Sequence, residues 1–238
     1  MTDKPLISVI IPVFNHARAL EKSLRTLCEQ KYRPIEALII DDGSTDNLQE
    51  VISGYIEMLS RAGIATRFIT QKNQGAAAAR NVGIQAAQGT YLICWDADTI
   101  ADRTMLEKLE HALSSHSDNA FSYCSFRFGW KTMRGRSFDI SALRKVNYID
   151  TTTLVRSADM ILFDPTLKRF QDWDVWLTLA AAGKKGIFVP ETLFSKIVHG
   201  RKGYSAWFPA FFLRLPWKTA RVKNYEVARS QIIKKHHL

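Results

Sequence analysis

The sequence predicts an α/β fold in which helices flank a mostly parallel sheet. Short apolar runs rich in β-branched residues, such as 6–13 and 35–40, alternate with longer segments whose apolar residues recur at helical spacing. Alternation at this pitch indicates βαβ units with right-handed crossovers. Acids also follow two runs directly, at Asp41-Asp42 and at Asp96-Ala97-Asp98. Because open α/β sheets bind ligands beyond the carboxyl ends of their strands, these acids indicate a functional site there.

The first half of the chain carries the clearest pattern. Strands are expected at 6–13, 35–40, 65–70 and 91–95, and helices at 17–30, 46–62, 75–87 and 103–113. The second of these helices places Leu48, Ile52 and Leu59 on one face, and Asp46 is its expected N-cap. The third is rich in alanine and is stopped by Gly89.

The second half is less regular. Strands are expected at 121–128, 151–155, 186–189 and 194–198, and a helix at 172–182. The basic stretch 127–145 is expected to be loop with some helix. No internal repeat is visible and no linker forces a split, so we expect one domain at 1–204 followed by a separate segment at 205–238.

The composition is that of a globular protein, with 238 residues of which 46% are hydrophobic and 24% are charged. No apolar run approaches the roughly 18–20 residues that span a bilayer. The first five residues lack the basic region and cleavage site of a signal peptide. Cys28, Cys94 and Cys124 lie far apart among apolar residues, which favours reduced core thiols over a zinc site. A cytoplasmic location is therefore expected.

The net charge of +10 is concentrated at the carboxyl end. Residues 199–238 hold nine Lys or Arg residues and the single acid Glu226, which leaves only +2 for residues 1–198. Aromatic residues stand among these cations, and basic amphipathic segments suit an anionic membrane surface. Peripheral membrane contact through 205–238 is one expectation. The alternative is a helix that packs on the domain or on a second subunit in a homodimer. No nucleic acid is expected as a partner, because no recognised binding motif accompanies the charge.

Five motifs occur in a fixed order between residue 6 and about residue 205, and His199 follows the last. They are Ser8–Asn15 (SVIIPVFN), Asp41–Asp46 (DDGSTD), Asn73–Asn81 (NQGAAAARN), Trp95–Asp98 (WDAD) and Asp172–Leu177 (DWDVWL). With these motifs the chain resembles the family 2 glycosyltransferases of GT-A fold, which have a Rossmann-like sheet. The resemblance implies an inverting, metal-dependent transferase that moves a sugar from a nucleoside diphosphate sugar, most often a UDP-sugar, to an acceptor hydroxyl. It also implies a nucleotide-binding half at 1–100 and an acceptor-binding half at 101–204.

The resemblance assigns residues of the first two motifs to the nucleobase. Pro12, Val13 and Asn15 match the loop that walls the base pocket. Asp42 matches the acid that accepts an N–H of the base, a task suited to a carboxylate because it only accepts hydrogen bonds. The alternative for Asp42 is a turn acid, since Asp is favoured before Gly43 in any case.

The segment 73–81 resembles the part of the family that closes over the nucleotide. Asn73 and Gly75 would line it, and glycine permits close backbone approach. Arg80 would contact the diphosphate, because a guanidinium matches phosphate geometry. The alternative, a face of small residues packed on the sheet, is compatible with this role.

The Asp-x-Asp pattern implies a metal and part of the donor site. By the resemblance Asp98 binds Mn²⁺ or Mg²⁺, and Asp96 contacts ribose or a metal-bound water. Such a metal bridges the diphosphate and neutralises the leaving group. His199 matches an additional ligand, although a surface or packed histidine is an equal alternative. Helix capping is the alternative for Asp98, with Asp102 the better capping candidate.

Asp172 falls where the family has its general base. The preceding residue is Gln171, where the family usually has Glu, and the missing charge should leave the pKa of Asp172 lower than a carboxylate pair would. The alternative for Asp172 is an N-terminal helix acid. Trp173 and Trp176 would line the acceptor side or pack in the core. The acceptor would be a carbohydrate or a lipid-linked glycan in polysaccharide or glycoconjugate synthesis.

Other functions are weighed against this one. Gln171 is the only hint of a sugar-nucleotide-binding protein that has lost catalysis. A nucleotidyltransferase would carry a Gly-rich basic loop after the first strand, where this chain has Pro12-Val13-Phe14-Asn15. A dinucleotide oxidoreductase is disfavoured by the lack of a G-x-G-x-x-G fingerprint. A membrane-associated scaffold would make 205–238 the active part.

Overall fold

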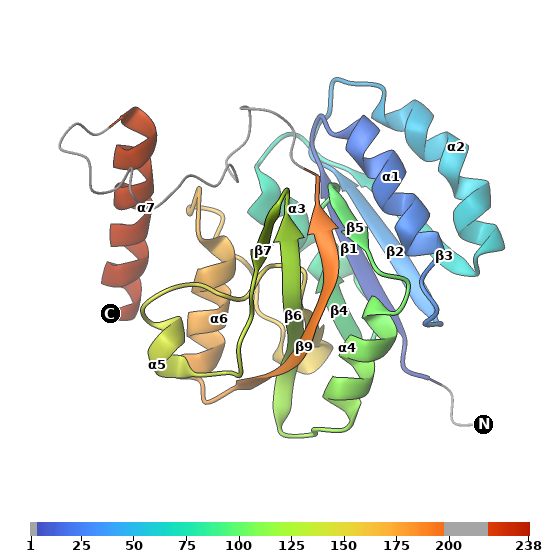
Figure 1. The fold of residues 1–238 in the computed structure, drawn as a ribbon. Coiled ribbons are helices and arrows are strands. Elements are labelled where there is room, and N and C mark those ends of the chain that lie inside the picture. The colour runs from blue at the N-terminus through green and yellow to red at the C-terminus, as the bar shows by residue number, and fades with distance from the viewer. Residues whose placement is uncertain (1–3, 198–218) are drawn as a thin grey trace.

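A mixed sheet forms the centre of the molecule (Figure 1). The computed structural model describes residues 4–197 and 219–238. In these residues the strands are β1 (Ile7–Val13), β2 (Ile35–Asp41), β3 (Ile64–Thr70), β4 (Tyr91–Cys94), β5 (Thr99–Ala101), β6 (Asn119–Phe128), β7 (Lys131–Met133), β8 (Leu154–Arg156) and β9 (Lys185–Lys196). The helices are α1 (Ala17–Cys28), α2 (Leu48–Arg61), α3 (Ala76–Ala86), α4 (Met105–Ser114), α5 (Ile140–Leu143), α6 (Gln171–Ala181) and α7 (Ala220–His236), with a 3-10 turn at Ser157–Asp159.

The strand order is β3-β2-β1-β4-β8-β6-β9-β5, and β7 pairs with β6. β1 to β4 run parallel, and β6 runs parallel to β9. β8 reverses direction between two strands, since it pairs antiparallel with β4 on one side and β6 on the other. β5 pairs antiparallel with β9, and β7 with β6. The predicted α/β class with a mostly parallel sheet is confirmed.

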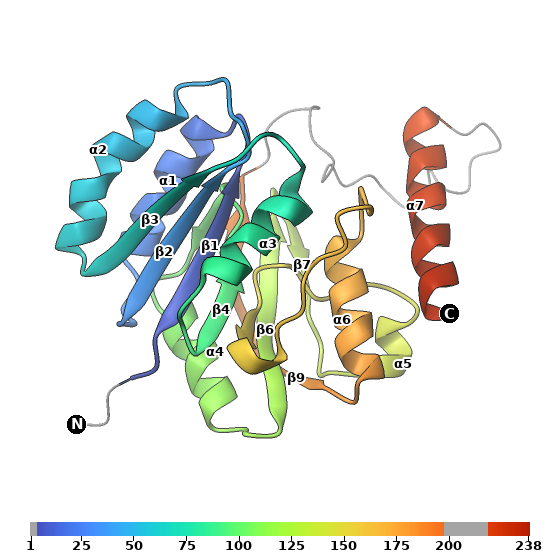
Figure 2. The same cartoon turned by 180° about the vertical axis from the view of Figure 1, so that it is seen from behind.

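Helices cover both faces of the sheet, as the two opposite views show (Figures 1 and 2). Ile7, Val9 and Ile11 of β1 are fully buried in a core cluster with α1, α2 and α4. Ile10 lies in a second cluster with Ala79 of α3. Strands buried on both faces read as continuous apolar runs, which is why these strands were recognisable. Each such side chain contributes roughly 1.5–3 kcal/mol of burial.

Close packing of α3 fixes its position on β1. A Cβ atom on Gly83 would overlap the side chain of Ile10. α3 begins after Gly75, whose φ of 92° is a backbone conformation that L side chains rarely adopt. Gly75 and Gly83 therefore set where the helix starts and how near it lies to the sheet, and so where Arg80 points.

Several elements differ from the sequence expectations. β5 lies where no strand was expected, and β7 lies in the stretch 127–145, which was expected to be loop with some helix. The strands expected at 186–189 and 194–198 are one strand, β9, with a register irregularity between Val189 and Thr192. Asp46 is not the N-cap of α2, which is Asn47. Its carboxylate instead accepts a hydrogen bond from the backbone N–H of Ala17 at 2.9 Å, at the start of α1. Asp46 therefore accepts a hydrogen bond from a free N–H group at a helix N-terminus, but the helix is α1 and not α2 as predicted.

The described part of the carboxyl-terminal segment packs on the domain. Ile232 of α7 is fully buried in the core cluster that contains Trp173 and Trp176 of α6. Asp174 of α6, which is 4% exposed, lies 2.9 Å from Nζ of Lys235 and 2.7 Å from Nε2 of His236. Residues 205–218 lie outside the described residues. In 4–197 and 219–238, no helix is both long and apolar enough to cross a membrane.

Asp174→Asn is expected to loosen α7. The change removes the negative charge that pairs with Lys235 and His236, and we expect the free energy of unfolding to fall by about 1–3 kcal/mol. Chemical denaturation measures the loss, and limited proteolysis should cut α7 earlier. Asp164→Asn is the matched control, because Asp164 also pairs with Lys235 but has a side chain that is 26% exposed, so its loss should stay below about 1 kcal/mol. Equal losses in both variants would contradict this account of the anchor.

Candidate active site

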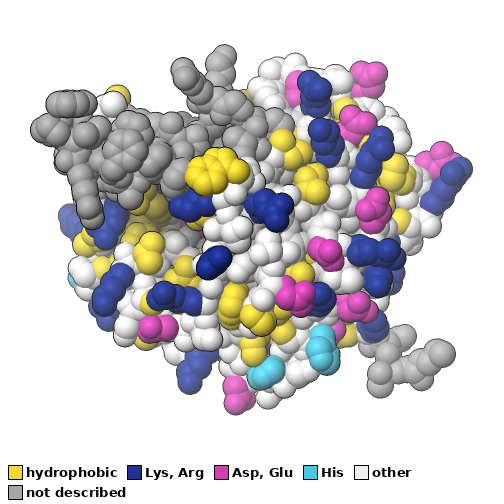
Figure 3. All heavy atoms as spheres, in the orientation of Figure 1, with side chains coloured by type: hydrophobic (Ala, Val, Ile, Leu, Met, Phe, Trp, Pro, Cys, Tyr) yellow, Lys and Arg dark blue, Asp and Glu magenta, His cyan; other side chains and the backbone are white. Residues whose placement is uncertain are grey.

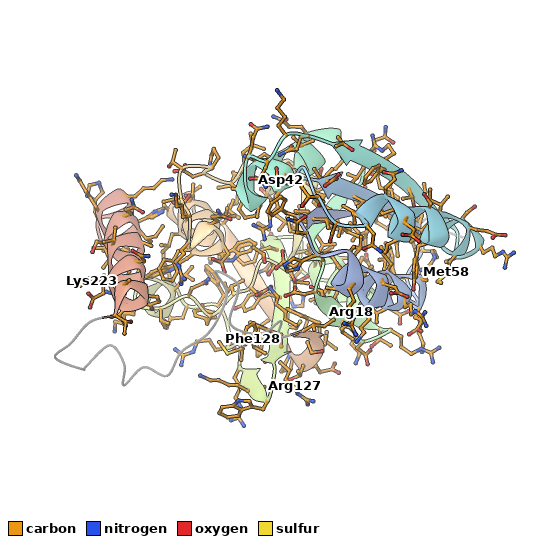
Figure 4. The ribbon with its side chains drawn as sticks, turned by 90° about the horizontal axis from the view of Figure 1, so that it is seen from above. Arg18, Asp42, Met58, Arg127, Phe128 and Lys223 are labelled. Carbon is orange, nitrogen blue, oxygen red and sulfur yellow. The ribbon has the colours of Figure 1, made fainter. Side chains whose placement is uncertain are left out.

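The site lies at the sheet edge where the parallel strands end, and Figure 4 looks down on it, with Asp42 on one side and Phe128 at the end of β6 on the other. β8 is antiparallel to its neighbours β4 and β6. The amino end of β8 therefore lies at the same edge of the sheet as the carboxyl ends of β4 and β6. The loop that precedes β8 therefore brings Asp150 and Thr151 to the acids that follow β4. This reversal places side chains at the site that no motif marks.

Asp96 is held by two cations. Its Oδ1 accepts a hydrogen bond from Nη2 of Arg80 at 2.7 Å, and its Oδ2 accepts one from Nζ of Lys196 at 2.8 Å. Burial alone would raise the pKa of Asp96, but Lys196 and Arg80 outweigh it and hold that pKa well below its usual range. Asp96 is therefore ionised throughout the physiological range.

Lys196 lies between two carboxylates. Its Nζ is 2.8 Å from Oδ2 of Asp96 and 2.8 Å from Oδ2 of Asp150, and its side chain is 10% exposed. Burial lowers the pKa of a lysine, but Asp150, Asp96 and Asp98 together raise the pKa of Lys196 above its usual value. The ammonium is thus a permanent charge of the site.

Asp98 has the opposite environment. Burial first, and then the negative charges of Asp96 and Asp150, raise the pKa of Asp98 to about 6. Within the described residues no side chain donates a hydrogen bond to its carboxylate, and its own N–H is the backbone donor that lowers the pKa. A carboxylate that receives so few hydrogen bonds has oxygens available for a hard cation, for which carboxylate oxygen is a preferred ligand.

The metal prediction can be tested against these contacts. Over residues 4–197 and 219–238, no three His, Cys, Asp or Glu side chains are arranged to hold a metal ion. Asp98 therefore fits as a single protein carboxylate, in the manner of Mg²⁺ sites in which substrate phosphates supply further ligands. The predicted second ligand, His199, lies outside the described residues.

Asp172 is the second residue of α6. Its Oδ2 accepts a hydrogen bond from the side-chain amide of Asn147 at 2.7 Å, and its Oδ1 accepts one from the N–H of Trp173 at 2.9 Å. Burial, followed by the charge of Asp150, raises the pKa of Asp172 to about 6. The raised value does not depend on residue 171, because Gln171 is neutral.

Gln171 has a contact of its own. Its side-chain oxygen accepts a hydrogen bond from Nη1 of Arg80 at 3.1 Å. With Asp96 on Nη2, the guanidinium has partners at both terminal nitrogens, and its central carbon lies 5.3 Å from the ring centre of Phe163. Arg80 is 8% exposed. A diphosphate contact would require Arg80 to exchange one of these partners.

Asp42 closes the loop at 71–75. Its carboxylate accepts hydrogen bonds from the side chain of Gln71 at 2.6 Å and from the N–H groups of Gln74 and Gly75, both at 2.8 Å. Asn73 donates to the carbonyl oxygen of Asp42 at 3.0 Å. Asp42 is 2% exposed. A base contact by this carboxylate therefore requires residues 71–75 to move.

The first motif adjoins this loop. Asn15, with a φ of 52°, accepts a hydrogen bond from the N–H of Thr45 at 2.7 Å and donates its own N–H to Ser44 at 3.0 Å. Pro12 pairs in register with β2. Val13 is buried in the core cluster with α1 and α2, and its carbonyl oxygen accepts from the N–H of Asp42. Of this motif, Asn15 is exposed, whereas the Val13 side chain belongs to the core.

Of the two roles considered for the tryptophans, lining the acceptor side or packing in the core, the structure shows core packing. Trp173 and Trp176 are 2% and 1% exposed. Their indole N–H groups donate to the carbonyl oxygens of Leu143 and Ile149. They position α6, and through it Asp172, rather than line an acceptor surface.

Sequence reasoning missed Asp150, Lys196 and Asn147. Asp150 and Asn147 precede a three-residue strand and belong to no motif. Lys196 carried the one usable signal, because it is a lone cation in the apolar run 193–198. A buried lysine must be paired, so its position predicts carboxylates nearby without naming them.

Comparison with known sequences identifies the family. Residues 8–167 match the model of Glycosyl transferase family 2. Over 123 residues the chain is 39% identical to an uncharacterized glycosyltransferase of Haemophilus influenzae, a match that covers 49% of this chain and 48% of that protein. Over 195 residues it is 29% identical to the putative teichuronic acid biosynthesis glycosyltransferase TuaG of Bacillus subtilis, covering 76% of this chain and 74% of TuaG. The chain thus spans less than half the length of relatives such as the H. influenzae protein.

Solved structures show the same architecture. TarS 1-349 of S. aureus in complex with UDP-GlcNAc superposes with a TM-score of 0.70 at 17% identity, over 97% of this chain and 71% of that one. The mannosyltransferase PcManGT of Pyrobaculum calidifontis, in complex with GDP-Man and Mn²⁺, gives 0.67 at 18% identity, over 97% and 70%. At these identities the likeness concerns the fold, and it confirms the predicted GT-A architecture. The family match extends over residues 8–167, and the chain belongs to glycosyltransferase family 2.

Proposed function

We propose that this chain transfers a sugar, with inversion, from a nucleoside diphosphate sugar to an acceptor hydroxyl. The observation that carries the proposal is Asp172, a part-buried carboxylate whose pKa is raised to about 6, at the same sheet edge as Asp96 and Asp98. A base poised near neutrality suits proton removal from a hydroxyl. UDP is the proposed nucleotide, because TarS was solved with UDP and UDP-GlcNAc. GDP is the alternative, since PcManGT was solved with GDP-Man.

In the proposed reaction Asp172 takes the proton of the acceptor hydroxyl as that oxygen attacks the anomeric carbon. Asn147 donates to one carboxylate oxygen of Asp172 and so orients the other. Arg80 and Lys196 supply fixed positive charge on the donor side, where the diphosphate leaves. With Mn²⁺ or Mg²⁺ held by Asp98, the site gains further positive charge beside the leaving group. His199 is proposed as the additional ligand.

The donor half is proposed to bind the nucleobase at Asp42. Gly75 gives the carboxylate an N–H, and Asn73 donates to the backbone carbonyl oxygen of the same residue. Asn15 contacts the nearby Thr45. Because three donors already use this carboxylate, the base N–H would replace one of them as residues 71–75 adjust. The carboxylate of Asp42 would then keep its charge and its orientation while one hydrogen-bond donor replaces another.

The acceptor side is proposed to favour an anionic or lipid-linked glycan. Arg127, Arg134 and Arg136 are exposed on or near the β6–β7 hairpin, and Trp130 at its tip is 86% exposed. Figure 3 shows basic side chains on both sides of a large hydrophobic one over this part of the sheet. Cations around an exposed tryptophan suit a membrane interface or a charged acceptor. Peripheral membrane contact through 205–238 remains part of this proposal.

Asp172→Asn is expected to lower kcat by about 10²–10⁴-fold, because the amide cannot accept the proton. UDP affinity, measured by calorimetry, should stay within about twofold, a difference well below 1.4 kcal/mol. Turnover is followed as UDP release from UDP-sugars with acceptor mixtures. Asp102→Asn is the control, because Asp102 is an exposed acid whose carboxylate accepts hydrogen bonds from Thr104. Unchanged turnover in Asp172→Asn would remove the general-base role of Asp172. Absence of turnover in wild type, with UDP still bound, would favour a protein that only binds sugar nucleotides.

The same base predicts a pH profile. The pKa of Asp172 is raised to about 6, so the ionised form needed for proton removal is present above that pH and is lost as pH falls through it. We expect kcat/KM to drop tenfold per pH unit below about 6. Thermal denaturation at each pH separates this loss from unfolding. A flat profile between about pH 5 and 7 would contradict the assignment.

Asp98→Ala is expected to abolish the dependence of nucleotide binding on metal. Calorimetric titration of UDP, with GDP as a control, should show wild type binding tighter with Mn²⁺ than without it. The variant should lose at least about tenfold in affinity with Mn²⁺ present, since one charge-assisted contact amounts to about 1.5–3 kcal/mol. Binding that is equally tight with and without metal in wild type would count against the proposed cofactor.

A further inference from the structure

The end of β9 brings a lysine into the acids of the site. Lys196 pairs in register with Thr99 of β5, and the next N–H along the chain, that of Ile197, donates to the carbonyl oxygen of Asp98 at 2.9 Å. Backbone pairing thus fixes the lysine beside the predicted metal acid. Its ammonium lies 2.8 Å from both Asp96 and Asp150.

The charges around this ammonium are unequal. We define the acidic cluster as Asp96, Asp98, Asp150 and Asp172. Arg80 and Lys196 are the two cations that contact it through described side chains. With all four acids ionised the cluster and its cations sum to two negative charges, and without Lys196 they would sum to three. Lys196 therefore neutralises, from within the chain, part of the charge that attracts a divalent cation.

The ammonium of Lys196 also occupies carboxylate oxygens that could otherwise bind a metal ion. Asp96 gives one oxygen to Arg80 and the other to Lys196, and Asp150 gives Oδ2 to Lys196 and Oδ1 to the N–H of Thr152. Among Asp96, Asp98 and Asp150, only Asp98 has a carboxylate to which no described side chain donates a hydrogen bond. One carboxylate binds a hard cation weakly, and further oxygen ligands must come from elsewhere.

We propose that Lys196 is an internal counter-ion that prevents a divalent metal from binding to the free protein, so that metal binds only together with the donor diphosphate. This inference rests on the proposed function, in which Asp98 holds the metal. The diphosphate supplies the oxygen ligands that Asp96 and Asp150 cannot offer while they contact the ammonium. Lys196 is thus a positioning residue that makes metal binding conditional on nucleotide.

The test measures Mn²⁺ binding to the protein without nucleotide, by electron paramagnetic resonance of free Mn²⁺. Lys196→Gln should bind Mn²⁺ at least about tenfold tighter than wild type, a change of 1.4 kcal/mol or more. Mn²⁺ alone should raise the melting temperature of Lys196→Gln and leave that of wild type unchanged. Lys196→Arg keeps the charge and should behave as wild type. Lys108→Gln, which removes a lysine paired with Glu191 on the surface, is the matched control.

A second pair of variants keeps the proposal testable if Lys196→Gln does not fold. Removing both members of a buried ion pair is tolerated better than removing one. The comparison of Asp150→Asn with Asp150→Asn/Lys196→Gln isolates the ammonium, and the double variant should bind Mn²⁺ more tightly. Equal Mn²⁺ affinity with and without Lys196 in the variants that fold would overturn the proposal.

Failure of this inference is distinguishable from failure of the proposed function. If wild type binds UDP equally well with and without Mn²⁺, the metal role of Asp98 fails, whatever the lysine variants do. If wild type binds Mn²⁺ tightly without nucleotide, the cofactor assignment stands and the role of Lys196 as an internal counter-ion is wrong.

Discussion

The ion pairs of Lys196 are the constraint on which the site depends. They join three segments far apart in the sequence: the residues after β4, the loop before β8 and the end of β9. A buried charge is tolerated only when it is paired, and removal of one partner commonly costs about 3–5 kcal/mol. The ammonium therefore holds Asp96 and Asp150 in fixed directions, beside Asp98.

The surroundings of Asp42 are organised in a related way. There a buried carboxylate receives donors from residues 71–75, so the loop that would meet a ligand is already arranged by an acid of the site. At Asp42 and at Asp96 the protein's own donors occupy carboxylates that the family resemblance assigns to ligands. Polar groups oriented before the ligand arrives lose little free energy to reorganisation when it binds. In the function proposed above, the exchange of one partner for another would be the main structural event of binding.

The sequence was informative where a pattern extends over many residues. β1, β2 and the amphipathic helices were recognisable because burial imposes a period on each. β5 and β7 have three residues each, too few for any period. Asp46 was assigned to the wrong helix, because capping preference is local and its partner at Ala17 is not. Asp150 and Lys196 reach the site through strand directions that only the folded sheet defines, so no spacing along the chain could name them.

The packing of α7 has a consequence for how the protein should be handled in the laboratory. Ile232 shares a core cluster with the tryptophans of the helix that carries Asp172. A chain shortened before residue 219 would expose that apolar surface to water and remove the partners of Asp174. Loss of turnover in such a fragment would reflect a disturbed α6 as much as a missing membrane contact. Point substitutions within 205–218 separate these two effects, and affinity tags belong at the amino end.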